Sequence, residues 1–139
     1  MRRFIAAALI AACWPASAEE VLAGPYPAAI VRVIDGDTVE ARVRIWLGQD
    51  LTVLVRIRDI DAPELHGHCP GEPEAAAAAR SHLIALLGEG AVRLSAIHYD
   101  KYGRRIDAAI GLPDGSDIGR AMLASGHARP MRRSRIKWC

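Results

Sequence analysis

Hydrophobic and polar residues alternate along the first half of the chain, as they do in strands that bury one face. The clearest run is 38–47, where Val39, Ala41, Val43 and Ile45 are separated by polar or charged residues. Shorter aliphatic and β-branched runs flank it, and glycine-containing turns separate the three runs. The pattern predicts a meander of three antiparallel strands at 28–34, 38–47 and 51–57.

The spacing changes to that of a helix in the second half. Pro73 suits a first helical turn, Glu72 and Glu74 stand at the positive end of the helix dipole, and Gly88 ends the pattern. The pattern predicts a helix at 75–87, and the apolar residues expected on its buried face are Ala76, Ala79, Leu83, Leu86 and Leu87. Further elements are predicted as strands at 91–97 and 105–112 and as a second helix at 117–125.

This order of elements predicts an α+β fold that is mainly β. Three strands, a helix, two strands and a final helix match a five-stranded OB-fold barrel, a common platform for nucleic acids. The predicted domain is 29–128, preceded by an extended leader at 19–28 and followed by a basic tail at 129–139. A chain of this length supports one hydrophobic core, and nothing in it demands more than a monomer.

The first 18 residues have the pattern of a secretory signal peptide. Arg2 and Arg3 precede an apolar stretch at 4–12, and Ala16-Ser17-Ala18 fits a cleavage site after Ala18. The apolar stretch is too short to span a bilayer, so a periplasmic or secreted protein without a membrane span is expected. The alternative is a lipoprotein cut before Cys13.

Charge and cysteine content change once this segment is removed. Lys and Arg fall from 18 to 16 through the loss of Arg2 and Arg3, against 16 Asp and Glu, so the remaining chain is formally neutral. Any nucleic-acid binding must therefore be local. Cys69 and Cys139 remain, and in an exported chain this pair indicates a disulfide; the alternative is two separate thiols.

The stretch from Arg56 to Glu64 carries the densest candidate chemistry. It begins as a strand and is ended by Pro63, which lacks an amide hydrogen. Arg56 and Asp61 are five residues apart, so an ideal strand would send them to opposite faces. If they share one site, the chain must leave strand geometry before Asp61; otherwise the stretch is a solvated charge cluster at a strand edge.

Two shorter segments add to it. Asp37 follows an Asp-Gly turn, where its carboxylate could point across the barrel mouth toward Asp61 and form an oxygen site suited to calcium. The segment 100–104 reads Asp-Lys-Tyr-Gly-Arg, which alone is typical of an exposed hairpin loop. A transition-metal site at 65–69 is the alternative use of His66, His68 and Cys69.

Together the three segments carry a family resemblance. They are Ile-Asp-Gly-Asp-Thr-Val around Asp37, Arg-x-x-x-x-Asp-Ala-Pro-Glu from Arg56 to Glu64, and Asp-Lys-Tyr-Gly-Arg ending at Arg104. With these motifs in this order, the chain from about 30 to 128 resembles the thermonuclease, or staphylococcal-nuclease-like, family of calcium-dependent phosphodiesterases. The resemblance implies hydrolysis of DNA and/or RNA, preferably single-stranded, with one calcium ion.

The resemblance also implies a role for each matching position. Asp37, Asp61 and the backbone carbonyl of Ala62 would hold calcium. Glu64 would activate or orient the attacking water. The scissile phosphate would be held by Arg56 and Arg104, and a neighbouring phosphate by Lys101 and Tyr102. These residue types suit an anionic substrate that gains charge during attack by water.

One departure concerns the bases. Arg129-Pro130-Met131 stands after Ala128, where the family commonly has a tyrosine that packs on the base. The basic tail would then supply phosphate contacts, giving salt-sensitive binding with little base preference. The alternative function is a non-catalytic OB-type nucleic-acid-binding module of the envelope.

Overall fold

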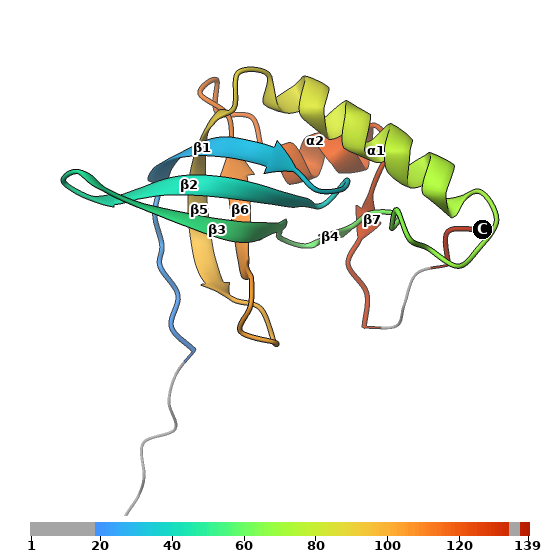
Figure 1. Cartoon of the computed structure of the whole chain (residues 1–139), viewed down its shortest axis with the longest axis horizontal. Helices are drawn as coiled ribbons and strands as arrows, with labels where there is room; N and C mark the ends of the chain where they lie inside the picture. Colours follow the sequence, from blue (N-terminus) through green and yellow to red (C-terminus); the bar gives the residue numbers. More distant parts are fainter. Residues whose placement is uncertain (1–18, 134–136) are drawn as a thin grey trace, which may run out of the picture.

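A computed structural model describes residues 19–133 and 137–139 of the chain; the predicted signal peptide at 1–18 lies outside them. Five strands form a closed barrel in the order β1-β2-β3-β6-β5 (Figure 1). Their bounds are β1 Tyr26–Val33, β2 Thr38–Trp46, β3 Gln49–Ile57, β5 Ala91–Tyr99 and β6 Ile106–Gly111. The predicted OB-fold-like barrel, α+β and mainly β, is confirmed.

Strand pairing closes the barrel through one parallel contact. β1, β2 and β3 pair antiparallel as the predicted meander, and β5 pairs antiparallel with both β1 and β6. β3 and β6 run parallel, with Arg56 opposite Asp107. The predicted leader is tied to the barrel, because β1 already begins at Tyr26 and the Leu22 amide donates to the Ile97 carbonyl at 2.8 Å.

The two helices pack across one end of the barrel (Figure 1). α1 spans Glu72–Leu87, three residues longer at its start than predicted, and α2 spans Ile118–Ala124. α1 buries Ala76, Ala79, Leu83 and Leu87, four of the five apolar residues expected on its inner face. Close packing depends on Gly36, where an added Cβ would lie 2.7 Å from Ala79 Cβ and 2.8 Å from Ala62 Cβ.

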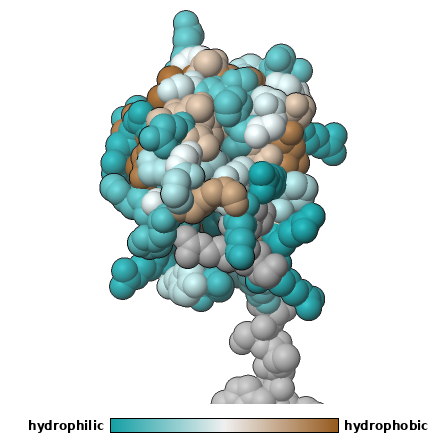
Figure 2. All heavy atoms as spheres, turned by 90° about the vertical axis from the view of Figure 1, so that its right-hand side faces the viewer, coloured by the Kyte–Doolittle hydropathy of each residue, from teal (hydrophilic) through white to brown (hydrophobic). Residues whose placement is uncertain are grey.

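A second, two-stranded sheet was not predicted. β4, Ile60–Asp61, pairs antiparallel with β7, Arg129–Pro130, and the Met131 amide donates to the Asp59 carbonyl at 2.9 Å. Strands of two residues carry no readable alternation, so the sequence gives no signal for them. The sheet folds the start of the basic tail back beside the Arg56–Glu64 stretch, at a mainly hydrophilic end of the molecule (Figure 2).

The tail is also fixed covalently. Cys69 and Cys139 form the predicted disulfide, which joins the loop before α1 to the last residue of the chain, with 6.1 Å between the two Cα atoms. Within the described residues, no helix has the length and apolar character needed to cross a membrane.

Removing this disulfide is expected to destabilise the protein by about 4 kcal/mol, because it closes a loop of 70 residues in the unfolded chain. The measurement is urea unfolding with and without reductant. In the double variant Cys69→Ala/Cys139→Ala, reductant should change nothing further. Alkylation of both cysteines in unreduced, unfolded protein would contradict the prediction.

Candidate active site

Arg56 lies between two carboxylates at the end of the barrel. Its Nη2 atom is 3.0 Å from Asp61 Oδ1 and 3.3 Å from Asp37 Oδ2, and it also donates to the Ile60 carbonyl at 3.3 Å. β3 ends at Ile57, and a turn with Asp59 at a φ of 63° redirects the chain before Asp61. The predicted departure from strand geometry is therefore present, and it brings Arg56 and Asp61 to one site.

Asp37 is the most fixed of these carboxylates. Its side chain is 10% exposed; Oδ1 accepts from the Thr38 hydroxyl at 2.8 Å and Oδ2 from the Ala62 amide at 2.9 Å. The Asp37 amide donates to Asp35 Oδ1 at 3.1 Å, which closes the turn between β1 and β2. The barrel and the segment after β4 thus hold Asp37 from two sides.

Negative charge exceeds positive charge at this point. Burial, and then the charge of Asp37, raise the pKa of Asp35 to about 6. Burial and Asp37 also raise the pKa of Asp61, against the opposing effects of Arg56 and of a hydrogen bond from the Trp138 side chain. The charge of Asp37 therefore disfavours the ionised forms of both Asp35 and Asp61.

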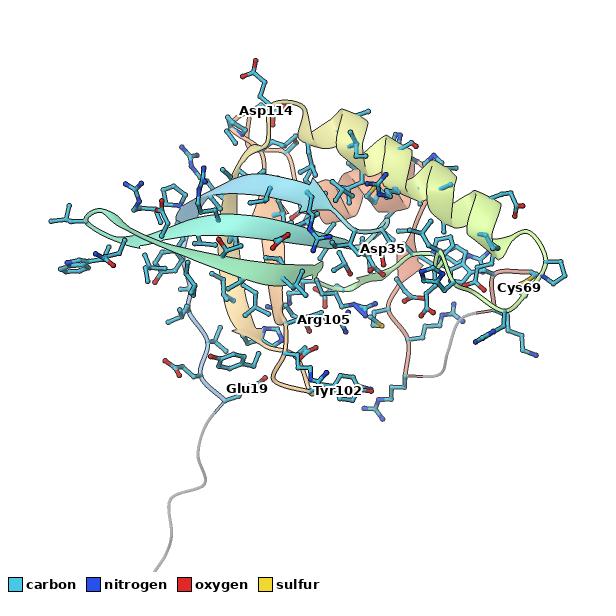
Figure 3. All side chains as sticks on the ribbon, viewed as in Figure 1. Glu19, Asp35, Cys69, Tyr102, Arg105 and Asp114 are labelled. Atoms are coloured by element: carbon cyan, nitrogen blue, oxygen red, sulfur yellow. A yellow bond between two sulfur atoms is a disulfide. The ribbon has the colours of Figure 1, made fainter. Side chains whose placement is uncertain are left out.

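An open cavity of about 500 Å³ adjoins Arg56. Lys101 and Tyr102 line it together with Arg105, and the β5–β6 loop that carries them lies beside the site (Figure 3). Asp100 shapes this loop. Its Oδ1 accepts from the amides of Tyr102 and Arg104, at 3.1 Å each, and Oδ2 accepts from Arg105 Nε at 3.1 Å.

The electrostatics of Asp100 fit this structural role. The residue is 8% exposed, and although burial raises its pKa, the hydrogen bonds from Arg105 and the loop amides outweigh burial and lower the pKa below its usual value. Sequence reasoning assigned Asp100 no role, yet an Asp that begins a loop commonly accepts amides further along it.

The two arginines predicted to hold the phosphate differ in exposure and in their position relative to the cavity. Arg56 has an 18% exposed side chain and lines the cavity. Arg104 is exposed, and it is not among the residues that line the cavity; its neighbour Arg105 is. The structure therefore brings Arg56, Asp37 and Asp61 together directly, and places Lys101 and Tyr102 around the same cavity.

Glu64 lies on the loop between β4 and α1 and is exposed. Its amide donates to Glu72 Oε1 at 3.2 Å, and its carbonyl accepts from the Gly67 amide at 3.0 Å. Glu72 is 5% exposed, and a Cβ on Gly67 would lie 2.1 Å from Glu72 Cδ. Glu72, expected only as a charge at the helix start, therefore organises the loop that carries Glu64.

Replacing Glu72 tests this organisation. Glu72→Ala leaves the Glu64 amide without its acceptor and is expected to lower the unfolding free energy by about 1–3 kcal/mol. Glu72→Gln retains an acceptor oxygen and should cost less. Urea unfolding measures both, and Glu74→Ala, an exposed change in the same helical turn, is the control. Equal losses for Glu72→Ala and Glu72→Gln would assign the effect to the charge instead.

The structure limits which metals this end of the molecule could hold. Over residues 19–133 and 137–139, no three side chains from His, Cys, Asp and Glu gather as a metal-binding group. Cys69 is in the disulfide, so it offers no thiolate to the alternative metal site at 65–69. A cation held by Asp37 and Asp61 would need its other ligands from backbone carbonyls, water or substrate.

No protein-family model and no curated protein matches the chain.

Proposed function

We propose that the protein is a thermonuclease-like, calcium-dependent nuclease that hydrolyses phosphodiester bonds in DNA and/or RNA, preferably single-stranded. The observation that carries the proposal is the hydrogen bonding of the Arg56 guanidinium. Its Nη2 is held by Asp37 and Asp61, while its Nε is buried and has no hydrogen-bond partner among the described residues. A buried, unpaired guanidinium N–H beside an open cavity is a donor prepared for an anionic ligand.

The surroundings of Arg56 suit a phosphodiester. Lys101 lines the same cavity and offers a second positive charge for a neighbouring phosphate, next to the exposed ring of Tyr102. The predicted mature chain is formally neutral, so attraction to the substrate comes from this local cluster. An open cavity edged by one exposed loop favours a flexible single strand.

The donor set fits one calcium ion. Asp37 and Asp61 already share one cationic group, and carboxylate oxygens are ligands that calcium prefers. The backbone carbonyl of Ala62 follows directly and would complete the protein's part. Calcium, when bound, supplies a positive charge that stabilises the phosphate oxygens during attack by water.

The protein's own groups would perform the remaining steps. Arg56 binds and orients the phosphate through fixed donors, and Arg104 would approach from its exposed loop. Glu64 accepts the proton of the attacking water as general base. Glu72 keeps the loop that carries Glu64 in place.

We further propose that the protein acts as a monomer in the periplasm or outside the cell. The pattern at 1–18 supports export, and the Cys69–Cys139 disulfide supports an oxidising compartment.

The test is degradation of single-stranded DNA and RNA by purified protein. Cleavage should require calcium, stop on chelation and resume when calcium is restored, and Asp37→Asn should remove it. If the protein binds the strands but cleaves neither with any calcium concentration, the non-catalytic binding module replaces the nuclease. Absence of both binding and cleavage would overturn the proposal.

A further inference from the structure

A second cavity lies next to the site and has no role in the proposed chemistry so far. It measures about 410 Å³ and is lined by His68, Pro70 and Glu72 from the loop before α1 and by Lys137, Trp138 and Cys139 from the tail. It shares no lining residue with the cavity beside Lys101 and Tyr102. The two cavities are therefore separate spaces.

Asp61 links the two cavities. On one side it accepts from Arg56, which lines the first cavity. On the other it pairs with Arg129 in the β4–β7 sheet, and the Arg129 guanidinium lies against the ring of Trp138, which lines the second cavity. The carboxylate pair thus stands between two spaces, and a strand whose phosphate contacts Arg56 can extend into both.

Trp138 is held in place by several independent contacts. The guanidinium carbon of Arg129 lies 4.4 Å from the centre of its ring, and Arg129 Nη1 donates to the Lys137 carbonyl at 3.0 Å. Arg129 itself pairs with Asp61 in the β4–β7 sheet, and the next residue, Cys139, is bonded to Cys69. An aromatic side chain fixed before binding loses little entropy when a ligand stacks on it.

The chemistry of the cavity suits a nucleobase. Arg129 lies over the Trp138 ring but does not line the cavity, whereas Trp138 does. The part of the ring that faces the cavity is therefore not the part that Arg129 covers. Pro70 and His68 provide further flat or apolar wall, and Lys137 supplies a positive charge for an adjoining phosphate. Every base presents a face that can stack on such a ring, whatever its sequence.

We propose that this cavity binds a nucleobase of the single-stranded substrate, stacked on Trp138, on the side of the scissile phosphate away from Lys101 and Tyr102. This inference rests on the proposed function and extends it, because it gives the enzyme contacts on both sides of the bond it cleaves. Occupation of both sides favours cleavage within a strand over cleavage at an end.

Fluorescence tests the contact without turnover. A short single-stranded oligodeoxynucleotide is titrated in the presence of chelator, so that it stays intact. Trp46 lies at the β2–β3 hairpin and is 72% exposed. Quenching of tryptophan emission should persist in Trp46→Phe and disappear in Trp138→Phe. Quenching that persists in Trp138→Phe would overturn the inference.

A double-mutant cycle, with one change in the protein and the other in the oligonucleotide, separates stacking from a structural effect of the substitution. Trp138→Ala is expected to weaken binding by about 5- to 150-fold, the equivalent of one stacked base. Removing one base at a time from the oligonucleotide should weaken binding to the wild type by a similar factor at one position, and should have no further effect there in Trp138→Ala. If the loss of affinity from removing a base multiplies with the loss from Trp138→Ala at every position, the two changes act independently, and that result would refute the contact. If the cycle holds but the wild type cleaves nothing with calcium, the base site stands and the nuclease proposal fails.

Discussion

Glu64→Gln is expected to lower turnover by roughly 10²–10⁴-fold, the range for losing general acid–base assistance. The amide side chain keeps the size of the carboxylate but cannot accept the proton of the attacking water. The loop should keep its shape, because its contacts to Glu72 and Gly67 use the Glu64 backbone. Single-turnover cleavage at saturating calcium measures the effect.

Binding must be measured alongside, with a labelled single strand under chelation, and it should stay close to that of the wild type. Glu74→Gln, an exposed glutamate on α1, is the matched control and should leave both measurements unchanged. Loss of binding with cleavage retained would make Glu64 a structural residue and remove it from the chemistry.

Arg56→Lys is expected to lower turnover by roughly 10²–10³-fold, the range for losing one preorganised donor to the developing charge. Lysine preserves the positive charge between Asp37 and Asp61 but offers a single point of contact, whereas the guanidinium presents Nη2 and Nε in a fixed plane. The apparent affinity for calcium, measured from the calcium dependence of cleavage, should change far less.

Arg58→Lys is the matched control for this change. Arg58 lies two residues further along, and its partner Asp59 has an 83% exposed side chain, so its ion pair contributes little and the variant should cleave normally. Full activity in Arg56→Lys would show that phosphate binding does not use the fork of Arg56.

Much of the framework follows from local patterns in the sequence. The alternation at 38–47 and the helical spacing from Ala76 to Leu87 depend only on which face each element buries, so the barrel strands and α1 could be predicted. That Arg56 and Asp61 share one site could be predicted only conditionally. In a regular strand, residues five positions apart point to opposite faces, so the two side chains can meet only if the strand ends before Asp61.

The parts of the site that escaped prediction depend on contacts between distant segments. Glu72 is buried only because Gly67 leaves room for it, and an acidic residue at a helix start is ordinarily solvated. Trp138 is brought to the Asp61 end of the molecule by the disulfide and by the two-residue strands β4 and β7, none of which leaves a periodic signal. Likewise, the loop sequence does not show that Arg105, rather than Arg104, faces the cavity.

The parallel pairing of β3 with β6 has a consequence for the order in which the protein folds. Arg56 and its carboxylate partners belong to the first half of the chain, while Lys101 and Tyr102 are held by the loop that leads into β6. Contacts between residues far apart in sequence form slowly, because a long loop must close first. The β1–β3 meander can therefore form before the substrate cavity exists. The protein should therefore gain the ability to bind substrate only when the barrel closes. During refolding, oligonucleotide binding should recover more slowly than the spectroscopic signal of the β1–β3 strands.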